Sequence, residues 1–242
     1  MVWAPNVQCG AALDDLWQHP LHLVDYRRAR YLAAVCGGWE EHLDEDDLDL
    51  SRWRRPLLAL QSSQPFSNPA GAPWIASFPQ LRPLPELVER IGGVWSSLPS
   101  EGPLVGLMVR AHVSAHRSTI QSKPLDHALA RLDQIRTLAP DATVFVSSDS
   151  PEASAVLRKF HPVVELPDKG EFNSVRGAQD AVCDLYILSA CQWIIGSHAS
   201  SFSEIAGLVA GHGGYETSVD CATADLATRL RAPRRTPRDF WV

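Results

Sequence analysis

The feature that most constrains the fold is a regular alternation, from Leu104 to Gly211, of short apolar runs with longer segments of helical periodicity. Strands are predicted at Leu104 to Val109, Thr143 to Ser147, Val163 to Leu166 and Trp193 to Gly196. Between them the apolar residues follow helical spacing, most clearly from Leu125 to Leu138 and from Arg176 to Cys191. Strands that alternate with helices in this way form parallel sheets covered on both faces. The predicted fold class is therefore α/β.

A less regular region, rich in Trp and Pro, precedes this pattern. Helices are predicted there at Tyr26 to Cys36 and at Pro85 to Ile91, with a short strand at Leu57 to Leu60. Proline and glycine in the segment Ser97 to Pro103 interrupt both helix and strand. We therefore predict an N-terminal unit over residues 1–100 and a C-terminal unit over 101–242, the latter ending in an arginine-rich tail that is docked or frayed.

Composition excludes several function classes. The formal net charge of -6 gives no general attraction to nucleic acid or to an anionic lipid surface. The five cysteines form no C-x-x-C pair, so free thiols in a reducing compartment are expected. The sequence has no signal-peptide pattern and no apolar window of the roughly 18 residues that a membrane span needs. A cytoplasmic protein with no membrane span and no nucleic-acid partner is the resulting expectation.

Polar residues follow three of the predicted strands at the point where each ends. Arg110 follows the first strand, Ser147, Ser148 and Asp149 close the second, and a serine-rich segment from Gly196 to Ser203 follows the fourth. Ligands of parallel α/β sheets collect at these carboxyl ends, where helix N-termini attract anions. A cation, a carboxylate and small hydroxyl residues suit a phosphate-bearing ligand. Helix capping is the alternative role for the aspartate and the serines.

Common phosphate and nucleophile motifs are missing from this sequence. It contains neither G-x-G-x-x-G nor G-x-x-x-x-G-K-[ST], which argues against a dehydrogenase of the usual kind and a P-loop enzyme. The segment Gly196 to Ser200 does not supply the G-x-S-x-G turn of a serine hydrolase. A different class of nucleotide-handling protein is therefore indicated.

Three blocks of the sequence resemble the fucosyltransferase-like glycosyltransferases, which include the nodulation, α-1,6 and protein O-fucosyltransferases. Gly106 to Arg110 is similar to the family's G-V-H-V-R strand, and Val144 to Asp149 to its F-L-A-S-D segment. Asp184 to Ser189, Ile195 to Ser197 and Ser200 to Glu204 together resemble its D-L-x-x-L-S...G-S-x-x-S-S-F-S-E block. The blocks span about 100 residues of the chain.

The resemblance implies a GT-B-like pair of Rossmann-like domains and a metal-independent, inverting transfer of fucose from GDP-fucose to a glycan or other small-molecule acceptor. No cofactor is implied beyond the GDP-sugar donor. Arg110 and Ser200 to Ser203 are then expected to hold the diphosphate, and Asp184 the nucleoside, with a helix-surface aspartate as the alternative for Asp184. The implied nucleotide-sugar-binding residues are Arg110, Ser148, Asp149, Asp184, Ser200, Ser201, Phe202 and Ser203.

The sequence departs from the family pattern at three places. Met108 stands where the family has a nucleotide-contacting histidine, which leaves the base and sugar of the donor open. Arg110 is followed by Ala111 and His112, and His112 is our candidate for the catalytic base, with His116 and Lys123 as alternatives. The chain begins where the family is already in its second strand, so an incomplete N-terminal half is expected. A catalytically silent nucleotide- or glycan-binding protein and a transferase that uses another nucleotide sugar remain alternatives.

Overall fold

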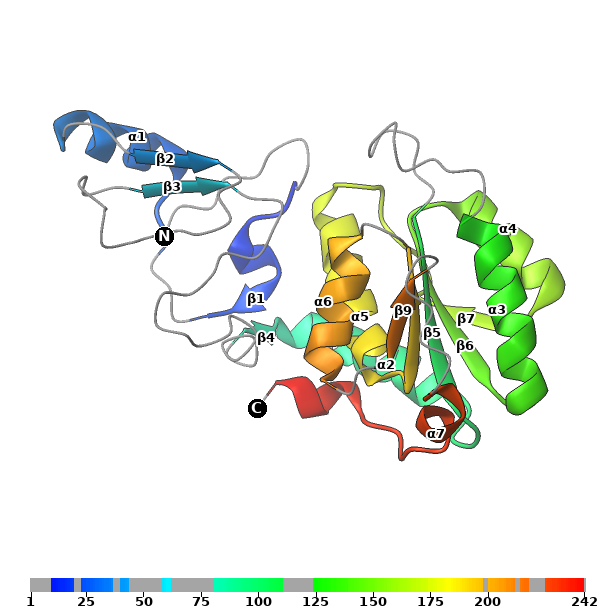
Figure 1. Cartoon of the computed structure of the whole chain (residues 1–242). Coiled ribbons are helices and arrows are strands. Elements are labelled where there is room, and N and C mark those ends of the chain that lie inside the picture. The colour runs from blue at the N-terminus through cyan, green and yellow to red at the C-terminus, as the bar shows by residue number, and fades with distance from the viewer. Residues whose placement is uncertain are drawn as a thin grey trace.

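The computed structural model describes residues 10–19, 23–36, 40–43, 58–61, 81–110, 124–197, 200–211, 214–217 and 225–241. Its core is a five-stranded sheet in the order β7-β6-β5-β8-β9, and every neighbouring pair is parallel (Figure 1). The strands are β5 (Leu104–Val109), β6 (Thr143–Ser148), β7 (Val163–Glu165), β8 (Trp193–Gly196) and β9 (Tyr215–Thr217). The predicted α/β class with a parallel sheet is confirmed.

The strand order is that of a Rossmann-like fold. Counted along the chain from β5, the strands lie in the order 3-2-1-4-5, so the direction of winding reverses between β5 and β8. Such a reversal is the topological switch point at which ligands of open α/β sheets bind, at the carboxyl ends of the strands. Arg110 follows β5 and Ser197 follows β8, so both stand at this point.

Helices cover both faces of the sheet (Figure 1). One face packs against α3 (Pro124–Leu138), α4 (Pro151–Phe160) and α7 (Leu226–Leu230). The other packs against α2 (Pro85–Ser97), α5 (Val175–Ala190) and α6 (Ser201–Ala210). Side chains of β5 alternate between the two apolar clusters, because successive residues of a strand point to opposite faces. Both faces are buried, which explains why the strands are apolar runs instead of alternating ones.

Local signals set the helix boundaries. Ser150 caps α4 by accepting a hydrogen bond from the Ala153 N–H, and Ser174 caps α5 in the same way from the Gly177 N–H. Gly211 ends α6 with a φ of 65°, a left-handed conformation that glycine adopts without steric cost. The predicted strands and helices of the C-terminal unit are confirmed, with small differences at their ends.

The N-terminal region contributes smaller elements. They are η1 (Leu13–Asp15), β1 (Trp17–Gln18), α1 (Tyr26–Val35), β2 (Glu40–Leu43), β3 (Leu58–Gln61) and β4 (Arg82–Pro83). The strands β2 and β3 form a parallel pair, in the region where the resemblance places the other half of a GT-B-like fold. The division near residue 100 stays a prediction, and the helix just before it, α2, packs in one core with α5.

The C-terminal tail is docked. The Arg234 guanidinium donates hydrogen bonds to the carbonyls of Gly102 (2.8 Å) and Glu101 (2.9 Å), and Arg235 donates to the carbonyl of Ala210 (2.6 Å). A last 3-10 turn, η4 (Pro237–Phe240), packs on α5 and buries Phe240. The arginines at 234 and 235 therefore fasten the tail to the fold.

In the described part of the chain, no helix combines the length and apolar character needed to cross a membrane. Cys36, Cys183 and Cys191 are free thiols, and the last two are buried among apolar side chains.

Candidate nucleotide site at the sheet switch point

A serine side chain joins the ends of the two central strands. The Ser197 hydroxyl accepts a hydrogen bond from the Arg110 N–H (3.1 Å) and donates one to the Met108 carbonyl (3.1 Å). The backbone that leaves β5 is thereby held against the segment that leads from β8 to α6. Two of the three sequence blocks meet at this contact, as their order along the chain predicts.

The N-terminus of α6 opens at the same edge. Its N-cap residue, Ser200, makes no capping hydrogen bond with its side chain, and the Ser200 hydroxyl instead contacts the Met108 sulfur at 3.8 Å. Ser200 and Ser203 are buried, Phe202 is half-buried and Ser201 is exposed. Because Ser200 does not occupy the first N–H groups of the helix, these donors and the positive end of the helix dipole are available to an anion.

Ser148 and Asp149 stand at the end of β6, where they were predicted. The Ser148 hydroxyl donates to the Ser150 carbonyl and accepts from the Ser150 N–H, at 3.1 Å each. Ser148 thus shapes the turn into α4, which is the capping type of role given above as the alternative. Asp149 is half-buried at the same edge of the sheet.

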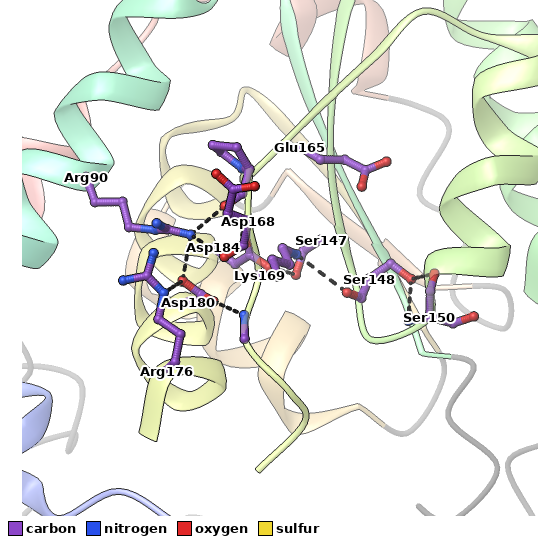
Figure 2. A network of polar contacts seen from close by, with 12 residues as sticks. Arg90, Ser147, Ser148, Ser150, Glu165, Asp168, Lys169, Arg176, Asp180 and Asp184 are labelled. Carbon is purple, nitrogen blue, oxygen red and sulfur yellow. Dashed lines mark hydrogen bonds and ion pairs between the residues drawn. The ribbon is translucent and has the colours of Figure 1, made fainter. Parts of the chain in front are cut away.

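Asp184 lies inside the molecule, on the side of α5 that faces the sheet. Only 4% of the residue is exposed, and its Oδ2 accepts hydrogen bonds from the Ser147 hydroxyl (2.7 Å) and the Lys169 ammonium (2.6 Å) (Figure 2). The alternative of a helix-surface aspartate is therefore wrong. Ser147 pairs with Met108 in the sheet register, so Asp184 lies one strand away from the Ser197 contact.

The charge of Asp184 is set by opposing effects. Burial raises the pKa of the Asp184 carboxyl, while the Lys169 ammonium and the hydrogen bonds from Lys169 and Ser147 oppose that rise. The second carboxylate oxygen, Oδ1, is buried and has no hydrogen-bond partner among the residues that the structure describes. Asp184 therefore keeps one acceptor that the described residues leave unused.

A second carboxylate, one helical turn earlier, anchors the loop that carries Lys169. Asp180 accepts a hydrogen bond from the Gly170 N–H (2.7 Å) and forms ion pairs with Arg90 (2.9 Å) and Arg176 (3.5 Å) (Figure 2). Arg90 also donates to the Pro167 carbonyl at 2.5 Å. Burial raises the pKa of Asp180, against the lowering effects of the Gly170 N–H, Arg176 and Lys169.

This loop contains two residues in the left-handed backbone region, Asp168 with a φ of 50° and Asn173 with a φ of 61°. Non-glycine residues adopt that region at a small energetic cost, which surrounding contacts must offset. Arg90 and Asp180 supply such contacts on one side, and on the other the Gly10 N–H donates to the Asn173 carbonyl at 2.8 Å. The position of Lys169 is therefore held from both sides.

The sequence prediction missed Lys169, together with Asp180 and Arg90. A signal for Lys169 was present, because the turn Pro167 to Gly170 follows the third predicted strand and so belongs to the same edge of the sheet. The candidate base His112 and its alternatives His116 and Lys123 lie outside the described residues. In the part of the chain described, no group of three or more His, Cys, Asp or Glu residues is arranged to hold a metal ion.

Neither a model of a known protein family nor a curated protein sequence matches the chain. Among solved structures, it is similar to the NodZ alpha-1,6-fucosyltransferase soaked with GDP-fucose, with 22% sequence identity, a TM-score of 0.44 and coverage of 54% of this chain and 44% of that chain. The corresponding values for the fucosyltransferase NodZ from Bradyrhizobium are 21%, 0.45, 54% and 44%. For POFUT1 in complex with GDP they are 16%, 0.44, 78% and 58%.

The chain thus spans less than two thirds of the length of each of these proteins. The two NodZ proteins are fucosyltransferases. At these identities and TM-scores, the backbones are similar only in part.

Proposed function

We propose that the protein binds a nucleotide sugar by its diphosphate at the carboxyl ends of β5 and β8 and acts as a metal-independent glycosyltransferase. The observation that carries the proposal is the Ser197 bridge, which brings the backbone of Arg110 beside the segment that enters α6. The backbone of a cationic residue and the segment that enters a helix N-terminus then lie at the switch point of the sheet, where such folds bind their ligands.

The chemistry of the site suits a leaving diphosphate. When the bond between the sugar and the nucleotide breaks, negative charge develops on the terminal phosphate. The Arg110 guanidinium and the free N–H groups at the start of α6 can stabilise that charge, which in other enzymes is the task of a divalent ion. The N–H groups belong to a helix that is formed before the reaction, so little reorganisation of these donors is needed as the charge appears.

The nature of the donor and the course of the reaction follow from the motif resemblance. They point to GDP-fucose as donor and to a glycan or small-molecule acceptor. In the inverting reaction, an acceptor oxygen forms a bond to the anomeric carbon from the face opposite to GDP, and GDP leaves with the electron pair of the broken bond. The acceptor proton passes to a base, for which His112 is our candidate.

Titration of the whole chain with GDP, followed by calorimetry, tests this assignment. Arg110→Ala is expected to weaken GDP binding by about tenfold or more, because it removes a charge-assisted contact to phosphate. Lys159→Ala is the matched control, since Lys159 is an exposed cation in the last turn of α4, at the other end of the sheet. Equal affinity of the Arg110→Ala variant and the wild type for GDP contradicts the proposal.

A catalytically silent nucleotide-binding protein is the second candidate. Two observations favour it: Met108 replaces a nucleotide-contacting histidine of the family, and Lys169 already occupies Oδ2 of Asp184. Release of free fucose or transfer product from GDP-fucose, measured with the intact protein and with Arg110→Ala, separates the two candidates. Turnover that disappears in Arg110→Ala eliminates the silent protein, and GDP binding without any turnover eliminates an enzyme that uses GDP-fucose.

A further inference from the structure

The two central strands of the sheet part at its carboxyl edge. The register between β5 and β8 has its last pair at Leu107 and Ile195. β5 continues beside β6 as far as Val109, and β8 continues beside β9 as far as Gly196. The backbones of β5 and β8 therefore stop pairing before either strand ends, and they do so at the switch point of the sheet.

The side chain of Ser197 takes the place of the next backbone pairing. When the register is continued by two residues, Ser197 stands opposite Val109. In a parallel ladder, the residue at this position donates its backbone N–H to the Met108 carbonyl and accepts the Arg110 N–H with its own carbonyl. The Ser197 hydroxyl makes both of these hydrogen bonds, each at 3.1 Å. One hydroxyl thus replaces two peptide groups of the ladder.

This replacement leaves the Ser197 backbone free to begin the turn into α6. The Ser197 carbonyl accepts a hydrogen bond from the Ser200 N–H at 3.2 Å. The end of β8 is also packed closely against α6, since a β-carbon added at Gly196 would lie 2.5 Å from the Ser203 hydroxyl. The chain can therefore turn from β8 into α6 at once while it stays fastened to the end of β5.

We propose that Ser197 is a positioning residue of the diphosphate site and acts through Arg110. This inference rests on the proposed function and assigns Ser197 no contact with the ligand. Without the hydroxyl, the Met108 carbonyl and the Arg110 N–H lose the group that holds them beside the segment entering α6. The backbone from which the Arg110 guanidinium extends can then shift relative to that helix. A diphosphate that needs both the guanidinium and the helix N-terminus is bound less tightly as a result.

Titration of the whole chain with inorganic pyrophosphate and with GDP, followed by calorimetry, tests the role of the hydroxyl. Ser197→Ala is expected to weaken the binding of both ligands about fivefold, since a typical hydrogen bond contributes about that much. Ser197→Thr keeps a hydroxyl and is expected to bind within about twofold of the wild type. Ser189→Ala is the matched control, because it removes a buried hydroxyl that donates to the Leu185 carbonyl inside α5. Equal losses in Ser197→Ala and Ser197→Thr overturn the inference.

A double-mutant cycle separates positioning from a general structural role. In the Arg110→Ala background, Ser197→Ala is expected to weaken pyrophosphate binding by less than about twofold, because the guanidinium that it positions is gone. A serine that only stabilised the fold would weaken binding by the same factor in both backgrounds. That result rejects an action through Arg110.

Hydrogen exchange of the wild type gives a measurement that needs no variant, in case Ser197→Ala does not fold. The Arg110 N–H follows the last residue of β5, and Ser197 accepts its hydrogen bond. We therefore expect this amide to exchange at least about tenfold more slowly than in an unstructured peptide, as resolved by NMR. Exchange at the rate of the unstructured peptide shows that the hydroxyl does not hold Arg110.

The outcomes distinguish this inference from the proposed function. If pyrophosphate and GDP bind, and Arg110→Ala weakens both while Ser197→Ala weakens neither, the diphosphate site stands and the role of Ser197 is wrong. If neither ligand binds the wild type, the proposed function itself is wrong, and the role of Ser197 with it.

Discussion

Two buried ion pairs in the same domain differ in how completely they are satisfied. Arg131 of α3 meets Glu216 of β9 with one N–H for each carboxylate oxygen, at 2.6 and 2.8 Å, and a third N–H goes to Gln134 at 2.7 Å. In the Lys169–Asp184 pair, one oxygen accepts both hydrogen bonds and the other accepts none from the part of the chain that the structure describes. The Arg131 and Glu216 side chains are 6% and 0% exposed, against 24% for Lys169.

The difference separates a structural ion pair from one suited to a ligand. The Arg131 guanidinium is also placed over the Trp193 ring, 5.9 Å from its centre, so this pair fixes α3 across β8 to the edge strand β9. It has no free acceptor on its carboxylate. Within the described residues, the Lys169–Asp184 pair leaves the acceptor Oδ1 without a partner, at the edge of the sheet where ligands bind.

The largest expected effect is on stability, when the Arg131–Glu216 pair is broken. Arg131→Ala leaves Glu216 as an uncompensated buried charge, so we expect the free energy of unfolding to fall by about 3–5 kcal/mol. Urea unfolding followed by circular dichroism measures the change. Arg229→Ala, which removes a partly exposed i,i+4 pair with Asp225, is the control and should cost less than about 1 kcal/mol. Similar losses in the two variants would show that the Arg131–Glu216 pair is not structural.

A smaller, pH-dependent loss of stability is expected when the Lys169–Asp184 pair is broken. Lys169→Met removes the group that opposes the burial-induced rise in the Asp184 pKa, so that pKa rises further. A carboxyl with a raised pKa in the folded state is protonated at low pH without loss of stability. The charged form of the carboxyl destabilises the fold, so stability is lost as the pH rises through that pKa.

The variant should therefore unfold almost like the wild type near about pH 4 and lose about 1–3 kcal/mol near about pH 8. Thermal and urea unfolding at the two pH values give the comparison. Ser147→Ala is the comparison variant: it removes one neutral hydrogen bond to the same oxygen and leaves the ammonium in place, so a smaller loss in the same direction is expected. A loss that is equal at both pH values contradicts an Asp184 that titrates in response to Lys169.

The smallest effect concerns a buried histidine whose nearest acid is at the surface. His161 is 4% exposed, and Asp133 lies 3.6 Å from its Nε2. Burial and the positive charge of Arg136 lower the His161 pKa, and Asp133 partly opposes them. Because the unfolded chain then binds a proton more readily than the folded one, stability is present above about pH 6.5 and falls as the pH decreases through the lowered pKa.

His161→Gln is expected to reduce this acid-side loss by up to about 1 kcal/mol between about pH 7 and pH 5. The difference in unfolding free energy between variant and wild type, measured across that range, tests it. His127→Gln, on α3, is a control for a general effect of histidine removal. Parallel curves for wild type and His161→Gln would exclude His161 as a titrating group.

The elements that could be predicted from the sequence are those set by local patterns. β5, β8 and the middle of β6, Val144 to Val146, are apolar because both faces of the sheet are covered. Arg110 and the serines before α6 could be placed at one edge, because the carboxyl ends of parallel strands lie together. That inference needs only the order of strands and helices along the chain.

The Lys169–Asp184 pair could not be found in the same way. Asp184 interrupts an apolar helical face, and its burial depends on α5 packing over β6 with Ser147 beneath it. Lys169 meets Asp184 because of a loop with two left-handed residues, whose path depends on contacts with α2 and with Gly10. Such contacts join segments that are far apart in the sequence, and no local spacing encodes them.

The two outer strands of the sheet, β7 and β9, are only three residues long. A strand of this length exposes few unpaired backbone groups on its outer side, which limits the template that a foreign strand can extend. β9 also carries the buried Glu216, so a chain that adds to this edge meets backbone already fastened to α3. Concentrated solutions of the folded protein should consequently resist the growth of intermolecular sheets, even though the central strands are almost entirely apolar.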